Sequence, residues 1–190
     1  MGVLYQACAG NMLCCGMTAA ILIRPARFDD GQDDADFVRS LMREYAAHLN
    51  HAAGGEHICV ASLETELQSL PGAYASPEGI ILLAFADKTP AGCVALRPLN
   101  RIQSERACEM TRLWVVPEFQ GQKLGRRLAE TAIETATAAG YTAMYLSTMP
   151  ATMQAAHAIY ISLGFTPVEQ GPSEVASLRR SLASSPESVK

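Results

Sequence analysis

Residues 108–125, CEMTRLWVVPEFQGQKLG, place a strand, a turn and the start of a helix in immediate succession. The run from Glu109 to Val116 is rich in β-branched and large apolar residues, which predicts a strand. Pro117 ends this strand, because proline has no N–H group to donate to a neighbour. The run from Gln120 to Gly125 then leads into a long helical pattern. Backbone N–H groups at a helix start can bind an anion, so the stretch predicts a phosphate site.

The spacing of this turn fits neither of two common phosphate motifs, since the P-loop and the G-x-G-x-x-G dinucleotide pattern are both absent. Gly121 and Gly125 would let a phosphate approach the backbone closely, and Lys123, Arg126 and Arg127 would add positive charge. A helix that simply starts near a glycine is the competing interpretation. The preceding strand and the neighbouring cations favour the phosphate site.

Length and composition indicate one globular domain. The chain has 190 residues, 49% of them hydrophobic and 18% charged, and its formal net charge is −4. An acidic balance argues against a surface that coats nucleic acid. The six cysteines contain no C-x-x-C pair, so we expect neither a disulfide framework nor a metal site and place the protein in the cytoplasm. Cys93 and Cys108 lie in strand-like runs and are expected to be core residues.

The N-terminal part differs in composition from the rest of the chain. Residues 1–23 carry no charged side chain, and they lack the basic start of a secretory signal. Gly, Asn, Gln and Thr interrupt the apolar residues, which disfavours a membrane span, although a signal or lipid anchor stays open. We expect residues 1–20 to form a poorly ordered extension, residues 21–182 a single domain, and residues 183–190 a tail.

Hydrophobic periodicity and turn signals predict the order β-α-α-β-β-β-α-β-α-β-β. The expected strands are 21–24, 79–86, 91–96, 109–116, 141–148, 165–169 and 175–182. A first helix is expected to begin near Asp29–Asp34 and to have Phe37, Leu41, Tyr45 and His48/Leu49 on its apolar face, and further helices are expected at 63–70, from 124 and at 151–163. A strand, its crossover helix and the next strand form a right-handed unit with parallel strands, whereas the hairpin before them is antiparallel. The prediction is therefore a mixed sheet with helices on both faces.

The same residues resemble a known family, the GNAT superfamily of acetyl-CoA-dependent N-acetyltransferases. Its signature [QR]-x-x-G-x-[GA] follows a strand of the form E-x-x-x-L-x-V-x-P. The positions that match this pattern are Glu109, Leu113, Val115, Pro117, Gln120 and Gly125. Residues 155–165, AAHAIYISLGF, resemble the family's A-x-x-x-Y-x-x-x-G-F end, and further segments look like one bacterial subgroup. The resemblance covers about residues 21–182, while Lys123 replaces the middle glycine of the signature.

The resemblance implies a GNAT-like α/β (α+β) fold, a mostly antiparallel sheet with one parallel crossover, and direct acetyl transfer from acetyl-CoA to a primary amine. It implies that the backbone of residues 113–115 holds the pantetheine arm and that residues 120–126 hold the pyrophosphate. Met153 stands where many members have an asparagine that contacts the cofactor arm. The implied cofactor-binding residues are Leu113, Trp114, Val115, Gln120, Gly121, Gln122, Lys123, Leu124, Gly125, Arg126 and Met153.

Two side chains are candidates for proton transfer. Glu109, directly or through water, is the candidate base, because an alkylammonium with a pKa of about 10.4 must lose a proton before it attacks. Strict alternation would place Glu109 on the strand face of Leu113 and Val115, with Trp114 on the opposite face. Tyr160 occupies the family's position for the acid that assists the departing thiolate. The competing interpretations are a solvated Glu109 and a Tyr160 that only packs in the core.

The acceptor is the least readable part. In the family the region between the first strand and the hairpin shapes the acceptor pocket, so Tyr45 and His48 are candidate substrate contacts. The spacing of His48, His51 and His57 fits no metal-ligand pattern, and no metal is expected. Expected partners are a small-molecule or peptide amine, with no nucleic acid and no membrane, and a homodimer stays open. The alternative function is a catalytically silent acyl-CoA-binding sensor, and a third is a non-acyl phosphate-binding domain.

Overall fold

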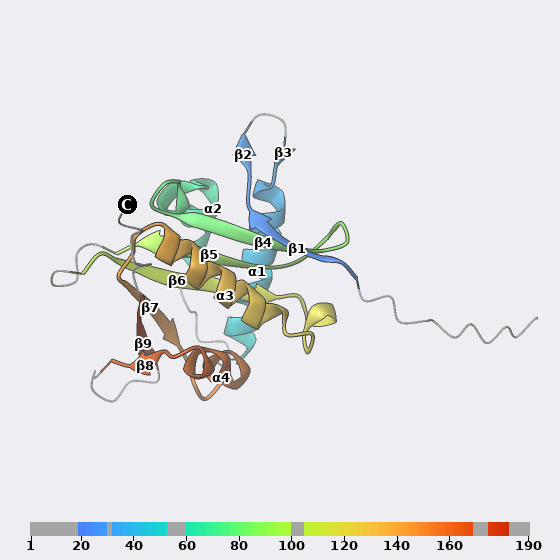
Figure 1. Cartoon of the computed structure of the whole chain (residues 1–190). Helices are drawn as coiled ribbons and strands as arrows, with labels where there is room; N and C mark the ends of the chain where they lie inside the picture. The colour runs from blue at the N-terminus through green and yellow to red at the C-terminus, as the bar shows by residue number, and fades with distance from the viewer. Residues whose placement is uncertain (1–18, 30–31, 53–59, 100–104, 169–174, 183–190) are drawn as a thin grey trace, which may run out of the picture.

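The computed structural model describes residues 19–29, 32–52, 60–99, 105–168 and 175–182 (Figure 1). The expected extension and tail therefore lie outside the described residues, except for Ala19 and Ala20. The strands are β1 Ile21–Pro25, β2 Phe28–Asp29, β3 Gln32–Asp33, β4 Ile80–Ala86, β5 Thr89–Pro98, β6 Ala107–Val115, β7 Ala143–Thr148, β8 Thr166–Pro167 and β9 Ala176–Ser181. The helices are α1 Ala35–Ala52, α2 Val60–Gln68, α3 Leu124–Ala138 and α4 Gln154–Ser162, with short 3-10 turns η1 Gly72–Tyr74 and η2 Pro117–Phe119.

Within the described residues, seven strands form one mixed sheet in the order β1-β4-β5-β6-β7-β9-β8. β6 and β7 are parallel, with Glu109 opposite Tyr145, and the other paired neighbours in this sheet are antiparallel. The helix α3 connects the two parallel strands, as a right-handed crossover requires. The predicted GNAT-like architecture is thereby confirmed, including its one parallel pair.

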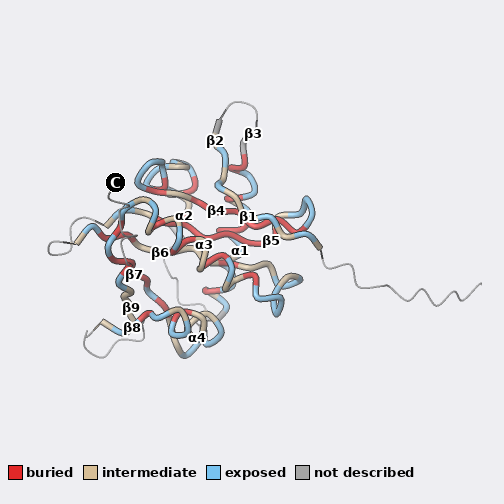
Figure 2. The backbone as a smooth tube through the Cα atoms, viewed as in Figure 1, coloured by how far each residue is buried: buried red, intermediate tan, exposed pale blue. Residues whose placement is uncertain are grey.

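Helices cover both faces of the sheet, and its central strands β4 and β5 are mostly buried (Figure 2). Each face has its own apolar cluster. Alternation along β4 divides the two: Leu82 and Ala84 face the cluster that includes residues of α3, whereas Ile81 and Leu83 face the cluster that includes residues of α1 and α2. A strand buried on both faces reads as a continuous apolar run, and β4 has the sequence IILLAFA. We call the two sides the α3 face and the α1 face.

A β-bulge in β6 overturns the expected alternation of side chains. Ala95 pairs with Thr111 but Cys93 pairs with Trp114, so β6 has one more residue than β5 between these pairs. Arg112 lies in this bulge with a φ of +58°. The extra residue shifts the pleat, so Glu109 and Trp114 share the α1 face, while Leu113 and Val115 pack on the α3 face. The expectation that Trp114 lies opposite Glu109 is wrong.

Smaller differences from the predicted elements have local causes. Phe28–Asp29 pairs with Gln32–Asp33 as the short ribbon β2–β3, which hydrophobic periodicity does not predict because each strand has only two residues. The core face of α1 contains Val38, Leu41 and Met42, while Phe37 is largely exposed. Helix α4 begins at Gln154, later than the predicted residue 151, because residues 150–152 form a turn closed by N–H bonds to the Met149 carbonyl.

Candidate active site

The site begins where the two parallel strands separate. β7 pairs with β6 only over residues 107–109 and 143–145, and beyond these it pairs with β9 alone, so the strands diverge (Figure 1). The Val116 N–H donates to the Ala91 carbonyl of β5. Because N–H groups alternate between the two edges of a strand, those of Leu113 and Val115 point to the opposite edge, into the gap. The gap thus offers the backbone of β6 to an extended ligand.

The loop that enters α3 carries a run of unsatisfied donors. Gln120 N–H donates to Pro117 and Arg127 N–H to Lys123, but in the described part of the chain the N–H groups from Gly121 to Arg126 donate to no protein acceptor. Gly121 and Lys123 both have positive φ, +75° and +61°, which curls this segment. Consecutive N–H groups in such a curl, backed by the helix dipole, form a concave anion site.

The two glycines of the loop leave space that the fold does not need. A Cβ at Gly121 would meet no atom within 4 Å, and one at Gly125 would meet only Val115 Cγ2 at 3.6 Å and Ile159 Cδ1 at 3.8 Å, which are ordinary contacts. By contrast, a Cβ at Gly92 would lie 2.5 Å from the Trp114 carbonyl oxygen, so that glycine is required by close backbone packing. The absence of a side chain at Gly125 therefore fits the approach of a ligand rather than the packing of the protein.

The side chains around the loop have distinct roles. Lys123 and Gln122 are exposed, whereas Leu124 is buried in the core and offers only its backbone. Arg126 donates from Nε to Glu130 at 2.8 Å and from Nη1 to Ser162 Oγ at 2.9 Å, which holds its guanidinium between α3 and α4. Gln120 Nε2 donates to the Val115 carbonyl at 2.9 Å and so ties the loop to the end of β6.

Glu109 lies on the α1 face and is paired with an arginine that the sequence interpretation missed. Arg97, opposite it on β5, donates from Nε at 2.7 Å and approaches from Nη2 at 2.6 Å, both to Glu109 Oε2. Oε1 of Glu109 accepts no hydrogen bond among the described residues. The side chain is 18% exposed, so the carboxylate is shielded without being closed off from solvent. The cross-strand position was readable only once the register of β5 and β6 was known.

Tyr160 lies on the other side of the sheet. It projects from α4 into the cluster of the α3 face, where its ring packs against Phe165 at a centroid distance of 6.0 Å. Burial raises the pKa of Tyr160, and the nearby Tyr45 hydroxyl adds to the rise. Its own hydroxyl makes no hydrogen bond among the described residues. The ring of Tyr160 therefore packs in the core, while its hydroxyl keeps its capacity to donate a hydrogen bond.

Tyr45 connects the two candidate groups. Burial raises the pKa of Tyr45, Arg112 opposes the rise, and the charge of Glu109 adds to it. Since Tyr45 also acts electrostatically on Tyr160, it lies within range of both Glu109 and Tyr160. His48, also on α1, is exposed, and its ring lies 5.0 Å from that of Trp114 in a tilted arrangement. The structure therefore places both Tyr45, at 6.3 Å, and His48 beside Trp114.

Two buried polar atoms on the far side of the gap have no partner among the described residues: Thr148 Oγ1, at the end of β7, and His157 Nδ1, on α4. Thr148 shares its strand face with Met144 and Leu146, so its hydroxyl points to the α3 face, on which Tyr160 packs. Buried polar groups are normally satisfied, which suits a ligand that passes between β7 and α4. Met153, just before α4, is half-buried, and neither Thr148 nor His157 was predicted as a contact.

A second cluster that the sequence interpretation missed lies beside Arg97. Glu66 of α2 accepts hydrogen bonds from Arg112 Nε at 3.1 Å and Nη2 at 2.7 Å, and from the Tyr74 hydroxyl at 2.8 Å. Burial disfavours a charged Glu66, but Arg112 outweighs it and lowers the pKa of that carboxyl. These residues and Arg97 line a pocket of about 450 Å³ on the α1 face. The bulge at Arg112 turns its side chain toward α2, and alternation alone does not predict this.

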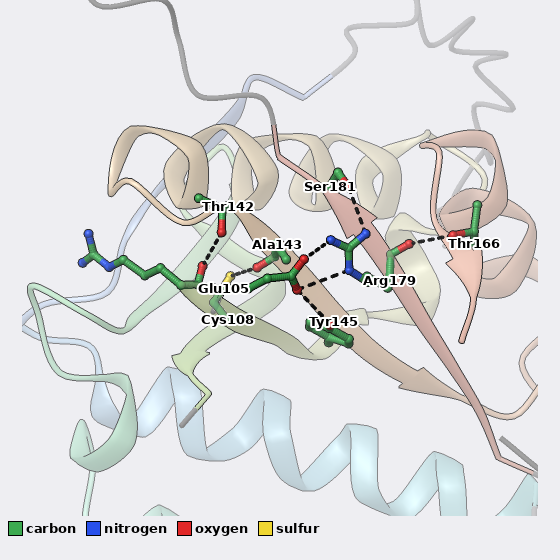
Figure 3. A network of polar contacts seen from close by, with 9 residues as sticks. Glu105, Cys108, Thr142, Ala143, Tyr145, Thr166, Arg179 and Ser181 are labelled. Carbon is green, nitrogen blue, oxygen red and sulfur yellow. Dashed lines mark hydrogen bonds and ion pairs between the residues drawn. The ribbon is translucent and has the colours of Figure 1, made fainter. Parts of the chain in front are cut away.

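The strands beyond the gap are fastened by a polar network (Figure 3). Glu105, just before β6, accepts a hydrogen bond from the Tyr145 hydroxyl of β7 at 3.0 Å and pairs with Arg179 of β9. Arg179 also donates to Ser181 Oγ at 2.9 Å. The network ties β6, β7 and β9 together at the end where β6 and β7 are still paired, which fixes the point from which they separate.

Other chemistries find little support in the part of the chain that is described. Among those residues no group of three or more His, Cys, Asp or Glu side chains could hold a metal ion. Cys93 and Cys108 are fully buried, as expected, and burial raises the pKa of both thiols to about 12, so neither is a ready nucleophile. Cys59 and His57 lie outside the described residues. None of the described helices combines the length and apolarity needed to cross a membrane.

Comparison with known proteins agrees with this geometry. Residues 38–165 match the acetyltransferase (GNAT) family. An uncharacterized N-acetyltransferase of Schizosaccharomyces pombe is 33% identical over 137 residues, which cover 72% of this chain and 78% of that protein. A GNAT-family acetyltransferase of Staphylococcus aureus has the same fold, with a TM-score of 0.67 at 17% identity over 86% of this chain and all of that one. The PaiA N-acetyltransferase of Thermoplasma acidophilum, solved in complex with coenzyme A, gives a TM-score of 0.63 at 18% identity, with coverage of 85% and 99%.

Proposed function

Because the chain belongs to the acetyltransferase (GNAT) family, we propose that it transfers the acetyl group of acetyl-CoA directly to a primary amine bound at the same time. One observation carries the proposal: the open edge of β6 leads directly into the run of free N–H groups before α3. A linear ligand with a diphosphate at one end and amide groups along its arm matches both parts. The Thermoplasma neighbour of the same fold contains coenzyme A, which supports this match.

The donor would lie with its pyrophosphate on residues 120–126 and its pantetheine arm along Leu113 to Val115. The arm would pass between β6 and β7 and meet the unpartnered Thr148 Oγ1 and His157 Nδ1, which its amides can satisfy. Met153 would contribute an apolar wall in place of an amide side chain. In this position the thioester reaches the gap at Val115, whose free N–H can donate to the thioester oxygen and stabilise the oxyanion that develops there.

Glu109 would prepare the amine from the α1 face. The incoming ammonium gives a proton to Glu109, directly or through water, and the neutral nitrogen then forms a bond to the thioester carbon. The carbon–sulfur bond breaks, and the thiolate leaves on the α3 face. The second proton, which the nitrogen loses as the amide forms, passes to solvent water or to the departing thiolate. Glu109 and Tyr160 lie on opposite faces of the sheet, which places proton removal and thiolate departure on opposite sides of the reacting carbon.

Tyr160 would serve the departing sulfur. Its raised pKa keeps the phenol protonated at neutral pH, so it can donate a hydrogen bond to the thiolate. An ordinary thiol has a pKa of about 8.5, below that of the phenol, so complete proton transfer from Tyr160 is uphill and the hydrogen bond is the main contribution. Direct transfer of this kind requires no covalent acetyl-enzyme, in keeping with the buried thiols of Cys93 and Cys108.

The test is a screen for CoA release across amine classes, using the full chain and acetyl-CoA. With an accepted amine, Glu109→Gln and Tyr160→Phe should each lower kcat by about 10²-fold or more, the usual size of acid–base contributions. The dissociation constant for acetyl-CoA should change less than about threefold, since neither side chain is proposed to hold the donor. Glu134→Gln, an exposed glutamate on α3, is the matched control and should behave as wild type.

The competing functions give different results in the same assay. A catalytically silent acyl-CoA-binding module would bind acetyl-CoA but release no CoA with any amine. A non-acyl phosphate-binding domain would not bind acetyl-CoA at all. Unchanged turnover in both Glu109→Gln and Tyr160→Phe would contradict the proposed roles while leaving the activity itself standing.

A further inference from the structure

The pocket of about 450 Å³ lies apart from the loop that is proposed to hold the pyrophosphate of the donor. It lies on the α1 face between α2, η1 and the strands β5 and β6, and it is lined by Glu66, Tyr74, Arg97 and Arg112 among others. The loop that enters α3 is not among its lining residues. Glu109 is not among the lining residues either, but Arg97 both lines the pocket and contacts Glu109, so one guanidinium connects the pocket to the candidate base.

Within the pocket, Glu66 and Arg112 form an ion pair whose carboxylate is already fully hydrogen-bonded. The Glu66 carboxylate accepts hydrogen bonds from Arg112 at 3.1 and 2.7 Å and from Tyr74 at 2.8 Å. Both partners of the ion pair are shielded, with 20% and 23% of their side chains exposed. A carboxylate that already holds three hydrogen bonds has little capacity left to attract a cationic ligand. Glu66 and Arg112 therefore form part of the wall and add no net charge.

Arg97 differs from this pair. Its side chain is 42% exposed, and Nε and Nη2 are directed at one oxygen of Glu109. Nη1 donates to no acceptor among the described residues, so the guanidinium has donors to spare on the pocket side. A guanidinium presents its donors as a planar fork, which suits a carboxylate better than any neutral group. The spare donors of Arg97 therefore make this pocket suitable for an anion.

Resting on the proposed function, we infer that the acceptor is an amine that carries a carboxylate close to its amino group, as an amino acid does. The carboxylate binds Arg97, and the amino group lies at Glu109. The same guanidinium touches both carboxylates, so the two ends of the acceptor are held a few ångströms apart, the spacing within an amino acid.

The test compares matched acceptors that differ only in the anionic group: free amino acids against their carboxamides and against the corresponding decarboxylated amines. The wild-type protein should use the acid with a kcat/KM at least about tenfold higher, because the others leave the Arg97 donors unpaired. Arg97→Gln should abolish the preference, so that in this variant kcat/KM for the acid falls to the value for the carboxamide. Arg43→Gln, an exposed ion-paired arginine on α1 outside the pocket, is the control and should keep the wild-type preference.

Two results would overturn the inference while leaving acetyl transfer intact. One is a wild-type enzyme that uses carboxamides or diamines as well as amino acids, a comparison that needs no variant. The other is an equal loss for acid and carboxamide in Arg97→Gln, which would mean that Arg97 only positions Glu109. If no amine releases CoA, the proposed function fails, and thermal shifts of the CoA-saturated protein with the amino acids and their carboxamides still decide the pocket. Equal shifts would reject the anion site, and a larger shift with the acid would support it.

Discussion

The carboxylate of Asp34 lies between the end of β1 and the start of α1. It accepts hydrogen bonds from the Arg24 guanidinium at 2.6 and 3.0 Å and from the Arg27 N–H at 2.8 Å. The hydrogen bonds from Arg24 lower the pKa of Asp34, although burial opposes them. Glu109 is also paired with an arginine, but one of its oxygens accepts no hydrogen bond among the described residues. Both oxygens of Asp34 are thus occupied by contacts that hold the fold together, whereas Glu109 keeps one oxygen that can accept a proton.

We expect Asp34→Asn to lower the free energy of unfolding at pH 7 by about 2–3 kcal/mol, because it leaves Arg24 without its charged partner. A depressed native pKa stabilises the fold above the ordinary value of about 3.9, and this contribution disappears as the pH falls through the lower native value. The gap between wild type and variant should therefore narrow below about pH 4. Urea unfolding at pH 7 and pH 3 measures both effects.

The control for this prediction is Asp36→Asn, whose side chain is 97% exposed in an i,i+3 pair with Arg39. Exposed helix pairs contribute little, so this change should cost less than about 0.5 kcal/mol. Equal losses in Asp34→Asn and Asp36→Asn would show that the Arg24 pair does not anchor β1 to α1.

At the scale of elements, the two ends of α3 use glycine for different reasons. Gly140, just after the helix, has a φ of +80°, which residues with a side chain rarely adopt. Gly125, near the first turn, is not among the glycines with positive φ and has no close backbone contact. Gly140 is thus required by the backbone conformation that ends the helix. Gly125 is not required by the helix, and it leaves open space beside the free N–H groups.

Gly125→Ala should separate folding from binding. Alanine favours a helix over glycine by up to about 1 kcal/mol, and the new methyl group meets only ordinary contacts, so stability should be unchanged or slightly higher. The same methyl group would occupy space beside the phosphate-binding N–H groups, and the dissociation constant for acetyl-CoA should rise at least tenfold. Denaturant unfolding and calorimetric titration provide the two measurements.

Gly140→Ala is the opposite case. It should lose about 1 kcal/mol of stability because its backbone conformation is strained, and it should bind acetyl-CoA as the wild type does. If Gly125→Ala bound acetyl-CoA normally, the loop before α3 would not be the pyrophosphate site.

At the scale of the whole molecule, the sheet consists of two parts joined by a short parallel pairing. β6 and β7 are matched over residues 107–109 and 143–145, and the network around Glu105 reinforces that junction. Beyond it, residues of α3 and α4 share the α3-face cluster, while no strand among the described residues fills the gap between β6 and β7. A ligand that hydrogen-bonds in this gap would join the two parts.

Coenzyme A should therefore stabilise the chain as a whole. At a concentration 100 times its dissociation constant, a ligand that binds only the folded state adds about 2.7 kcal/mol. For a chain of this size that corresponds to a rise in Tm of about 5–11 °C. Differential scanning calorimetry with coenzyme A, and with 3′-phosphoadenosine 5′-diphosphate as the fragment that keeps the pyrophosphate, should show a smaller rise for the fragment because it lacks the pantetheine arm that reaches the gap. No rise with coenzyme A would indicate a different ligand.

The stretch from Cys108 to Gly125 determined, by itself, the strand–turn–helix unit, the position of Pro117 and the glycine-spaced loop. These follow from local chemistry: β-branched residues, a missing N–H group, and glycines where the backbone must curl. The apolar runs of 80–86 and the periodicity of 124–136 likewise fixed the buried strand and the crossover helix. Local propensity and hydrophobic alternation depend only on residues that are close in the sequence, so they can be predicted from the sequence.

The tertiary structure alone decided which side chains share a face. One extra residue at Arg112 moved Trp114 to the side of Glu109, because a bulge becomes visible only when β5 and β6 are aligned. The same alignment placed Arg97 against Glu109, and the packing of α2 on the sheet brought Glu66 to Arg112. These contacts join residues that are 12 and 46 positions apart. Most of the proposed donor site lies in residues 113–126 and could be predicted from that segment, whereas the proposed acceptor pocket is assembled from α2, η1, β5 and β6 and forms only when these elements pack together.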